Sequence, residues 1–223
     1  MTTLRGNWNY PTSIKFGAGR IVELPEHCRA LGMQRPLLVT DAGLAPQPMV
    51  TNAVRLCREA GLHCGLFADV QPNPVEANVT AGVAAYRAGT HDGVIAFGGG
   101  SALDTAKAIA LMVGQSRPIW DFEDREDWFT RVDVAGMAPV VAVPTTSGTG
   151  SEVGRASVIT DVRDHTKKII FHPKMLPAIV LEDPELLGGE LERLAGHGDR
   201  ARAALEDHVR RLQLVAHRHL PAP

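Results

Sequence analysis

A short apolar run that ends in three consecutive glycines constrains the fold of this chain more than any other feature. Residues 93–97 (GVIAF) are continuously apolar, as expected of a parallel strand buried on both faces. The glycines at 98–100 then let the backbone turn sharply, because glycine lacks a Cβ. Ser101 and Asp104 are spaced as an N-cap and its capping-box acid, so we expect a helix to begin at Ser101.

This turn is a candidate phosphate site. The first amide groups of a helix have no partner within the helix, and the helix dipole makes that end positive. A pyrophosphate lying over the glycines would therefore be stabilised. The segment 98–107 (GGGSALDTAK) matches neither of the common glycine-rich motifs, GxGxxG and GxxxxGK[ST]. A strand-to-helix turn without a ligand is the alternative.

A second loop, rich in hydroxyl groups, follows another apolar run. Residues 140–143 (VVAV) predict a buried strand, and 144–152 (PTTSGTGSE) then supply threonines, serines and two glycines. Such a loop offers hydrogen-bond donors and acceptors to a ribose or a diphosphate. A solvated linker is the alternative, but linkers seldom follow a buried strand.

Apolar and amphipathic segments alternate along the rest of the chain. Expected strands are 36–40, 64–67, 93–97 and 140–143, expected helices are 21–31, 46–60, 75–88 and 102–113, and 8–10 with 13–16 form an N-terminal β-hairpin. This order predicts an α/β fold, a Rossmann-like parallel sheet with helices on both faces. Residues 114–137 are too long for an ordinary connection, so we expect a mobile flap or a partly helical insert.

Composition excludes several functional classes. The chain has 223 residues, 44% of them hydrophobic, and a net charge of −2, which argues against nucleic acid or an anionic membrane as a partner. No apolar run approaches about 18 residues and no N-terminal leader is evident, so we expect neither a membrane span nor a signal peptide. Cys28, Cys57 and Cys64 lack metal-binding spacing and indicate reduced thiols of a cytoplasmic protein.

Two polar residues at the ends of expected strands are further candidates. Asp41 follows strand 36–40, where an acid often binds the adenosine ribose and repels a 2′-phosphate, which favours NAD over NADP. Capping of the next turn is the alternative role of Asp41. Asn73 lies between Pro72 and Pro74, and we expect the following proline to hold its backbone extended.

With these motifs in hand, the chain resembles the iron-containing (group III) alcohol dehydrogenase family. The segments that carry the resemblance are 98–107, 144–153 (PTTSGTGSEV), 158–161 (VITD) and 172–186 (HPKMLPAIVLEDPEL), with weaker matches at 16–19, 38–41 and 72–74. They cover roughly residues 10–186, the N-terminal, dinucleotide-binding half of the family. The resemblance implies hydride transfer between an alcohol or aldehyde and NAD, with Asn73 near the nicotinamide and Lys167 near the ribose.

The resemblance also implies a metal site, and the end of the chain departs from it. Family members hold Fe²⁺ or Zn²⁺ with an Asp and three His of the C-terminal domain, the first two spaced Asp-x-x-x-His. Here Asp199 is followed four residues later by Ala203. We therefore assign no metal ligand and no catalytic residue. We expect a dinucleotide-binding domain at 1–186 and a divergent tail at 187–223, in which an amphipathic helix (199–219) replaces the family's helical metal domain.

The expected cofactor is NAD, with NADP as the alternative. Candidate cofactor-binding residues are Asp41, Asn73, Gly98, Gly99, Gly100, Ser101, Asp104, Thr145, Thr146, Thr149 and Lys167. The expected function is that of an alcohol dehydrogenase whose chain is incomplete. A catalytically inactive nucleotide-binding module and an enzyme similar to glycerol dehydrogenase or dehydroquinate synthase are the alternatives. A small alcohol or aldehyde is the expected substrate, and self-association is left open.

Overall fold

A seven-stranded sheet forms the centre of the fold. The computed structural model describes residues 5–9 and 12–187, and the statements below concern these residues. The strands are β1 (Arg5–Asn9), β2 (Ser13–Gly17), β3 (Pro36–Asp41), β4 (Gly65–Val70), β5 (Gly93–Gly98), β6 (Val140–Pro144) and β9 (Ile179–Glu182). Their order is β1-β2-β9-β6-β5-β3-β4. The last six are parallel, and β1 pairs antiparallel with β2, which confirms the predicted Rossmann-like sheet and hairpin.

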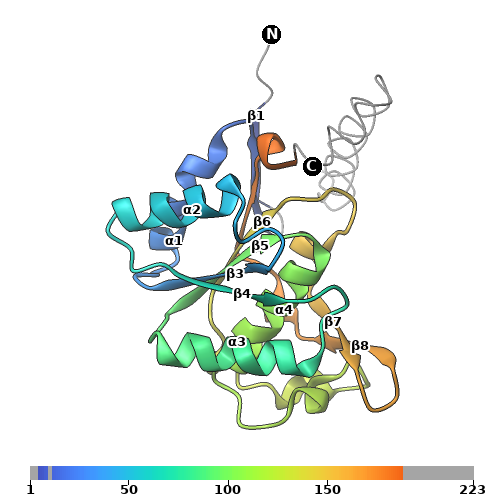
Figure 1. The fold of residues 1–223 in the computed structure, drawn as a ribbon. Coiled ribbons are helices and arrows are strands. Elements are labelled where there is room, and N and C mark those ends of the chain that lie inside the picture. The colour runs from blue at the N-terminus through green and yellow to red at the C-terminus, as the bar shows by residue number, and fades with distance from the viewer. Residues whose placement is uncertain (1–4, 10–11, 188–223) are drawn as a thin grey trace, which may run out of the picture.

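Helices cover both faces of the sheet (Figure 1). They are α1 (Leu24–Ala30), which continues a 3-10 turn at Arg20–Glu23, α2 (Pro48–Glu59), α3 (Glu76–Ala88) and α4 (Gly100–Met112). The pair α1 and α2 lies on one face, and α3 and α4 lie on the other. Within the described residues, the expected helices and strands are present, with bounds within three residues of those expected.

The continuous apolar strands are explained by two separate cores. In β5, Val94 and Ala96 face the core under α3 and α4, whereas Ile95 and Phe97 face the core under α1 and α2. Successive side chains of a strand point to opposite faces, so a strand buried on both sides needs an apolar residue at every position. All six residues of β5 are buried.

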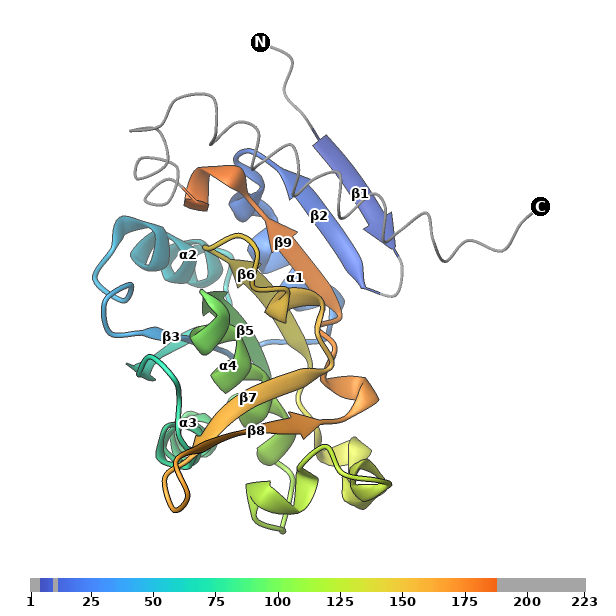
Figure 2. The ribbon, with the colours of Figure 1, turned by 90° about the vertical axis from the view of Figure 1, so that its right-hand side faces the viewer.

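A two-stranded hairpin lies beside α4, outside the main sheet (Figure 2). Its strands are β7 (Ala156–Asp161) and β8 (Thr166–Phe171), paired antiparallel. One edge of the hairpin is tied to the segment before α3, because the amide of Thr160 donates to the carbonyl of Pro74 at 2.7 Å. The other edge is tied to the insert, because the amide of Asp124 donates to the carbonyl of Ile169 at 2.7 Å.

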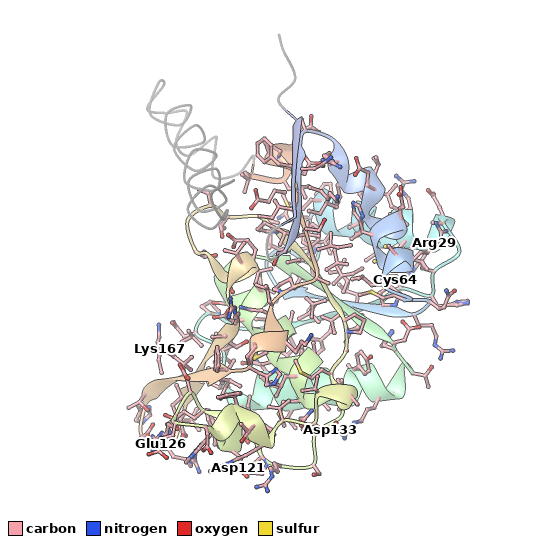
Figure 3. The ribbon with its side chains drawn as sticks, turned by 180° about the vertical axis from the view of Figure 1, so that it is seen from behind. Arg29, Cys64, Asp121, Glu126, Asp133 and Lys167 are labelled. Atoms are coloured by element: carbon pink, nitrogen blue, oxygen red, sulfur yellow. The ribbon has the colours of Figure 1, made fainter. Side chains whose placement is uncertain are left out.

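The insert at 114–137 is partly helical, with three short 3-10 turns. The Trp120 indole donates to the Glu76 carboxylate on α3 at 2.8 Å. The Gln115 side chain both donates to and accepts from the Asp133 backbone, each at 2.8 Å (Figure 3). Buried or half-buried bonds of this kind hold the insert against the domain, so the second of the two expectations is confirmed.

The three cysteines are buried, unpaired thiols, as expected. Cys28 lies on α1, Cys57 lies on α2, and Cys64 comes just before β4 (Figure 3). All three belong to the core that these helices cover. Contact with the Cys28 thiol and burial raise the pKa of Cys57 to about 12. Such thiols are poor nucleophiles at neutral pH, because the thiolate is the reactive form.

Two expectations fall outside the described residues. These are the amphipathic helix at 199–219 and the metal-spacing position at Ala203. Among the described helices, none combines the length and apolarity needed to cross a bilayer.

The carboxylate of Asp183 joins the end of β9 to the turn before α1. It accepts hydrogen bonds from the amides of Gly19 at 3.1 Å, Ile21 at 3.0 Å and Glu185 at 3.0 Å. Asp183 is only 1% exposed, so water cannot replace these bonds.

We expect Asp183→Ala to lower the free energy of unfolding by about 2–4 kcal/mol, because it leaves three amides without their acceptor. Asp92→Ala is the matched control. Asp92, which is half-buried, also accepts two backbone amides, those of Gln34 and Arg35, but these hydrogen bonds are exposed to solvent. Urea unfolding of both variants is the measurement. A loss at Asp183 no larger than the loss at Asp92 would contradict this role for the buried carboxylate.

Candidate functional site

The two loops singled out in the sequence meet at one edge of the sheet. Strands β5 and β6 are adjacent and parallel, with Gly98 paired opposite Pro144, so the segments that follow them leave the sheet side by side. The amide of Thr145 donates to the carbonyl of Gly98 at 3.0 Å. A Cβ at Gly99 would lie 3.1 Å from the Thr146 hydroxyl oxygen. The glycine turn and the hydroxyl loop are therefore neighbours at the carboxyl ends of β5 and β6.

The turn between β5 and α4 is tighter than the sequence suggested. Gly98 has φ +138°, and a Cβ there would lie 2.8 Å from the Cβ of Ala102, so this position requires glycine. Gly99 is the N-cap, and the helix already begins at Gly100. The prediction that Ser101 is the N-cap and Asp104 the capping-box acid was wrong, because both lie inside the helix. No side chain caps this helix end.

A cleft of about 700 Å³ opens above this turn. Its lining residues are Asp41, Ala42, Gly43, Leu44, Met49, Val70, Gln71, Pro72, Gly99, Gly100, Ser101, Ala102, Thr145, Thr146 and Leu186. Six of the candidate residues thus line one cavity. Sequence reasoning missed the apolar wall formed by Leu44, Met49, Val70 and Leu186. Leu44 follows β3, Met49 lies in the first turn of α2, Val70 ends β4 and Leu186 lies in the DPEL segment, and none of these positions marks a ligand contact.

Two other candidates lie just behind the lining. Gly98 is the buried base of the turn. Thr149 packs over the helix start, because a Cβ at Gly100 would lie 3.4 Å from the Thr149 Cβ. Asp104 and Lys107, further along α4, face away from the cleft toward the segment that follows Thr149.

Asp41 lines the cleft and also shapes the turn after β3. Its Oδ1 atom accepts the amides of Gly43 and Leu44, each at 2.9 Å. These are the bonds of an Asx turn, so the capping alternative is confirmed for this oxygen. The carboxylate is thereby fixed at the rim of the cleft, where it presents negative charge to a ligand.

Asn73 does not have the extended backbone that its following proline suggested. Its φ is +53°, in the left-handed region that asparagine tolerates better than most residues. We attribute this to a long-range hydrogen bond, in which the amide of Thr160 on β7 donates to the carbonyl of Pro74 at 2.7 Å. Asn73 is therefore at a sharp turn beside Pro72, which lines the cleft.

Lys167 lies opposite Thr160 in the hairpin, near the same turn. It is exposed, at the outer margin of the molecule (Figure 3). Its neighbour Lys168 instead binds Asp161 at 2.6 Å and Asp164 at 3.3 Å. Hydrogen bonds from the Arg163 guanidinium and from Lys168 hold the pKa of Asp161 below its ordinary value. Of the two lysines, only Lys167 is left at the surface to meet a ligand.

No group of three or more His, Cys, Asp or Glu side chains within residues 5–9 and 12–187 is arranged to hold a metal ion.

Comparison with known proteins gives the family. The sequence model of iron-containing alcohol dehydrogenases matches residues 11–184, and the chain belongs to that family. It is 38% identical to a 4-hydroxybutyrate dehydrogenase of Cupriavidus necator, over 81% of this chain and 46% of the relative. It is 34% identical to a NAD-dependent methanol dehydrogenase of Bacillus methanolicus, with the same two shares.

Solved structures give the same result. A 1,3-propanediol oxidoreductase superimposes with a TM-score of 0.73 at 32% identity, over 84% of this chain and 47% of that one. A sulfoacetaldehyde reductase of Bifidobacterium kashiwanohense, solved in complex with NAD⁺, gives a TM-score of 0.71 at 29% identity, over the same shares. The chain therefore spans about half the length of the relatives it matches.

Proposed function

We propose that this chain is the NAD-binding half of an alcohol dehydrogenase. The observation that carries the proposal is the meeting of an uncapped helix N-terminus with the hydroxyl loop at 145–149 in one cleft. When bound, the nicotinamide ring accepts or returns a hydride; the residues of this chain bind and orient the dinucleotide. Because the relatives are named as dehydrogenases or reductases of alcohols and aldehydes, we propose a small alcohol or aldehyde as the substrate.

The diphosphate at the centre of NAD fits the residues present. The first turn of α4 supplies backbone amides and the positive end of the helix dipole. Gly99 and Gly100 let the turn pack closely against the hydroxyl loop, since an added Cβ would lie 3.1 Å from the Thr146 hydroxyl oxygen or 3.4 Å from the Thr149 Cβ. The Thr146 hydroxyl oxygen is buried without a hydrogen-bond partner among the described residues. A phosphate oxygen above the turn would supply that partner.

The two nucleoside ends of the dinucleotide, adenosine and nicotinamide riboside, suit opposite sides of the cleft. The Asp41 carboxylate suits the adenosine ribose, because it accepts a bond from the 2′-hydroxyl. Leu44 and Met49 line the cleft beside it and suit the adenine ring. We assign Asn73 and Lys167 to the nicotinamide riboside side, since Thr160 binds the Pro74 carbonyl next to Asn73 and pairs with Lys167 in the hairpin.

The described residues do not fit the catalytic metal of the family. Fe²⁺ or Zn²⁺ needs a set of imidazole and carboxylate ligands, and the described residues contain no such cluster. We therefore derive no step through a metal from these residues. We propose a boundary between a dinucleotide-binding domain at 1–186 and a tail at 187–223, and a cytoplasmic location consistent with three free thiols.

An inactive nucleotide-binding module is the second candidate. The observation that favours it is Ala203 at the position where the family's spacing asks for a metal-binding histidine. Both candidates require nucleotide binding, and they differ in turnover.

We expect tighter binding of NAD than of NADP, because the Asp41 carboxylate repels a 2′-phosphate. Isothermal titration with each nucleotide is the measurement. Asp41→Asn keeps a side-chain oxygen for the Asx turn and should reduce the preference at least about fivefold. Equal affinity of the unchanged protein for both nucleotides would remove Asp41 from this role.

We expect Gly99→Val to weaken NAD binding by about 30-fold or more, because the added side chain would occupy the space of the diphosphate. Gly99 has φ −80°, which valine adopts without backbone strain, so the effect should come from the side chain. Ala88→Val, which adds two methyl groups at an exposed helix end, is the control. Unchanged NAD affinity in Gly99→Val would contradict the proposed diphosphate position.

We expect the 223-residue chain to show no alcohol dehydrogenase turnover, because a bound dinucleotide is only half of the reacting system. NADH absorbance over several small alcohols, with Fe²⁺ or Zn²⁺ added, is the measurement, with metal analysis of the purified protein beside it. Metal-dependent turnover above background would show that the chain holds ligands we did not assign.

A further inference from the structure

Helix α4 carries a buried lysine that no assigned role explains. Lys107 is 1% exposed, and its neighbours along the helix, Ala106 and Ala108, are apolar and buried. Lysine is almost never fully buried unless its charge is paired. The Nζ atom donates to the carbonyls of Ser151, at 2.9 Å, and Ala156, and lies 3.2 Å from the Asp104 carboxylate. The three donors of the ammonium group thus have three acceptors.

Asp104, one turn earlier, holds the same segment by other atoms. Its carboxylate accepts the Ser151 hydroxyl and the Val158 amide, the latter at 3.0 Å. Its carbonyl accepts the Ser157 hydroxyl at 2.7 Å. Asp104 and Lys107 together therefore bind the backbone or side chains of 151, 156, 157 and 158, which connect the hydroxyl loop to β7.

The loop at 145–150 lies between this attachment and the sheet. At its start, the Thr145 amide is bonded to Gly98. Within it, Gly148 and Gly150 have φ of +86° and +69°, and an added Cβ at either position would meet nothing within 4 Å. Two such glycines give the unfolded loop many conformations. Attachment at both ends limits these conformations.

A buried ion pair is a costly way to gain stability alone. Removing charges from water is costly, and apolar residues of similar volume often stabilise a core better. Burial lowers the pKa of Lys107, and the carboxylates of Asp104 and Glu152 oppose that shift. An ammonium does what an apolar side chain cannot, since it holds two carbonyls at fixed positions.

We propose that Asp104 and Lys107 are positioning residues that hold the loop at 145–150 in its nucleotide-binding conformation before the nucleotide arrives. This inference rests on the proposed function of that loop. Neither side chain lines the cleft, so neither contacts the nucleotide. The apparent dissociation constant rises in inverse proportion to the binding-competent fraction, so releasing the loop weakens binding without removing a contact.

The experiment compares Lys107→Met with the 223-residue parent chain. Lys174→Met is the matched control, since it removes an exposed lysine. In the protein without nucleotide, hydrogen exchange in 145–158 should rise at least about tenfold in Lys107→Met, while exchange in β5 and β6 stays within about twofold. The dissociation constant for NADH should rise at least about tenfold, and the control should match the parent in both measurements.

A pH series adds a readout that general destabilisation would not give. The charged groups facing the ammonium are the carboxylates of Asp104, on the same helix, and Glu152, in the 3-10 turn Ser151–Val153. Lys107 keeps its positive charge below its lowered pKa and loses it above. NADH affinity of the parent should therefore fall as pH rises toward the ordinary lysine value of about 10.4, and Lys107→Met should lack this fall.

A second variant keeps the test decisive if Lys107→Met folds poorly. Ser151→Ala removes the hydroxyl bonded to Asp104 without changing charge, and we expect about a threefold rise in both exchange and NADH dissociation constant. Exchange within about twofold of the parent in whichever variants fold would overturn the proposal. If the parent itself fails to bind NADH, the proposed function is wrong, and the exchange measurement still decides the role of Asp104 and Lys107.

Discussion

The pairing of β5 with β6 is the constraint on which the site depends. These two parallel strands lie in the middle of the sheet, in register from Val94 opposite Val140 to Gly98 opposite Pro144. Each residue of both strands is buried, which fixes the pair between the two helical layers. Because the strands end together, the glycine turn and the hydroxyl loop begin within hydrogen-bonding distance. A register shift of one residue would separate them and reverse every core contact of β6.

Those parts of the fold and site that depend on local pattern could be predicted from the sequence. The apolar run at 93–97, the glycines after it and the hydroxyl loop after 140–143 each indicate a local structure, and topology then requires the two loops to meet. Asp104 could not be placed in this way. Its spacing from Ser101 fits a capping box, but its partners are Ser151 and Val158, some fifty positions away. Distant donors override a local motif when they satisfy the same carboxylate.

The backbone of Asn73 also differs from its expected conformation because of a distant contact. A following proline disfavours helical backbone and favours an extended one, yet the bond from Thr160 to Pro74 imposes a left-handed turn. The apolar wall of the cleft was equally hidden, because Leu44, Met49 and Leu186 come from separate segments of the chain. A leucine or methionine at such a position carries no sequence signal that separates a ligand contact from a core contact.

The contacts of β7 connect the diphosphate and nicotinamide parts of the proposed nucleotide site. Asp104 and Lys107 join the start of β7 to the helix whose N-terminus would hold the diphosphate, and Thr160 joins the other end of β7 to the turn at Asn73. The hairpin therefore fixes the spacing between the proposed diphosphate subsite and the proposed nicotinamide subsite. In hydride transfer, fixed spacing of this kind determines which ring face meets the substrate. In the proposed function the described residues supply orientation, and polarisation of the substrate oxygen requires groups that residues 5–9 and 12–187 do not bring together.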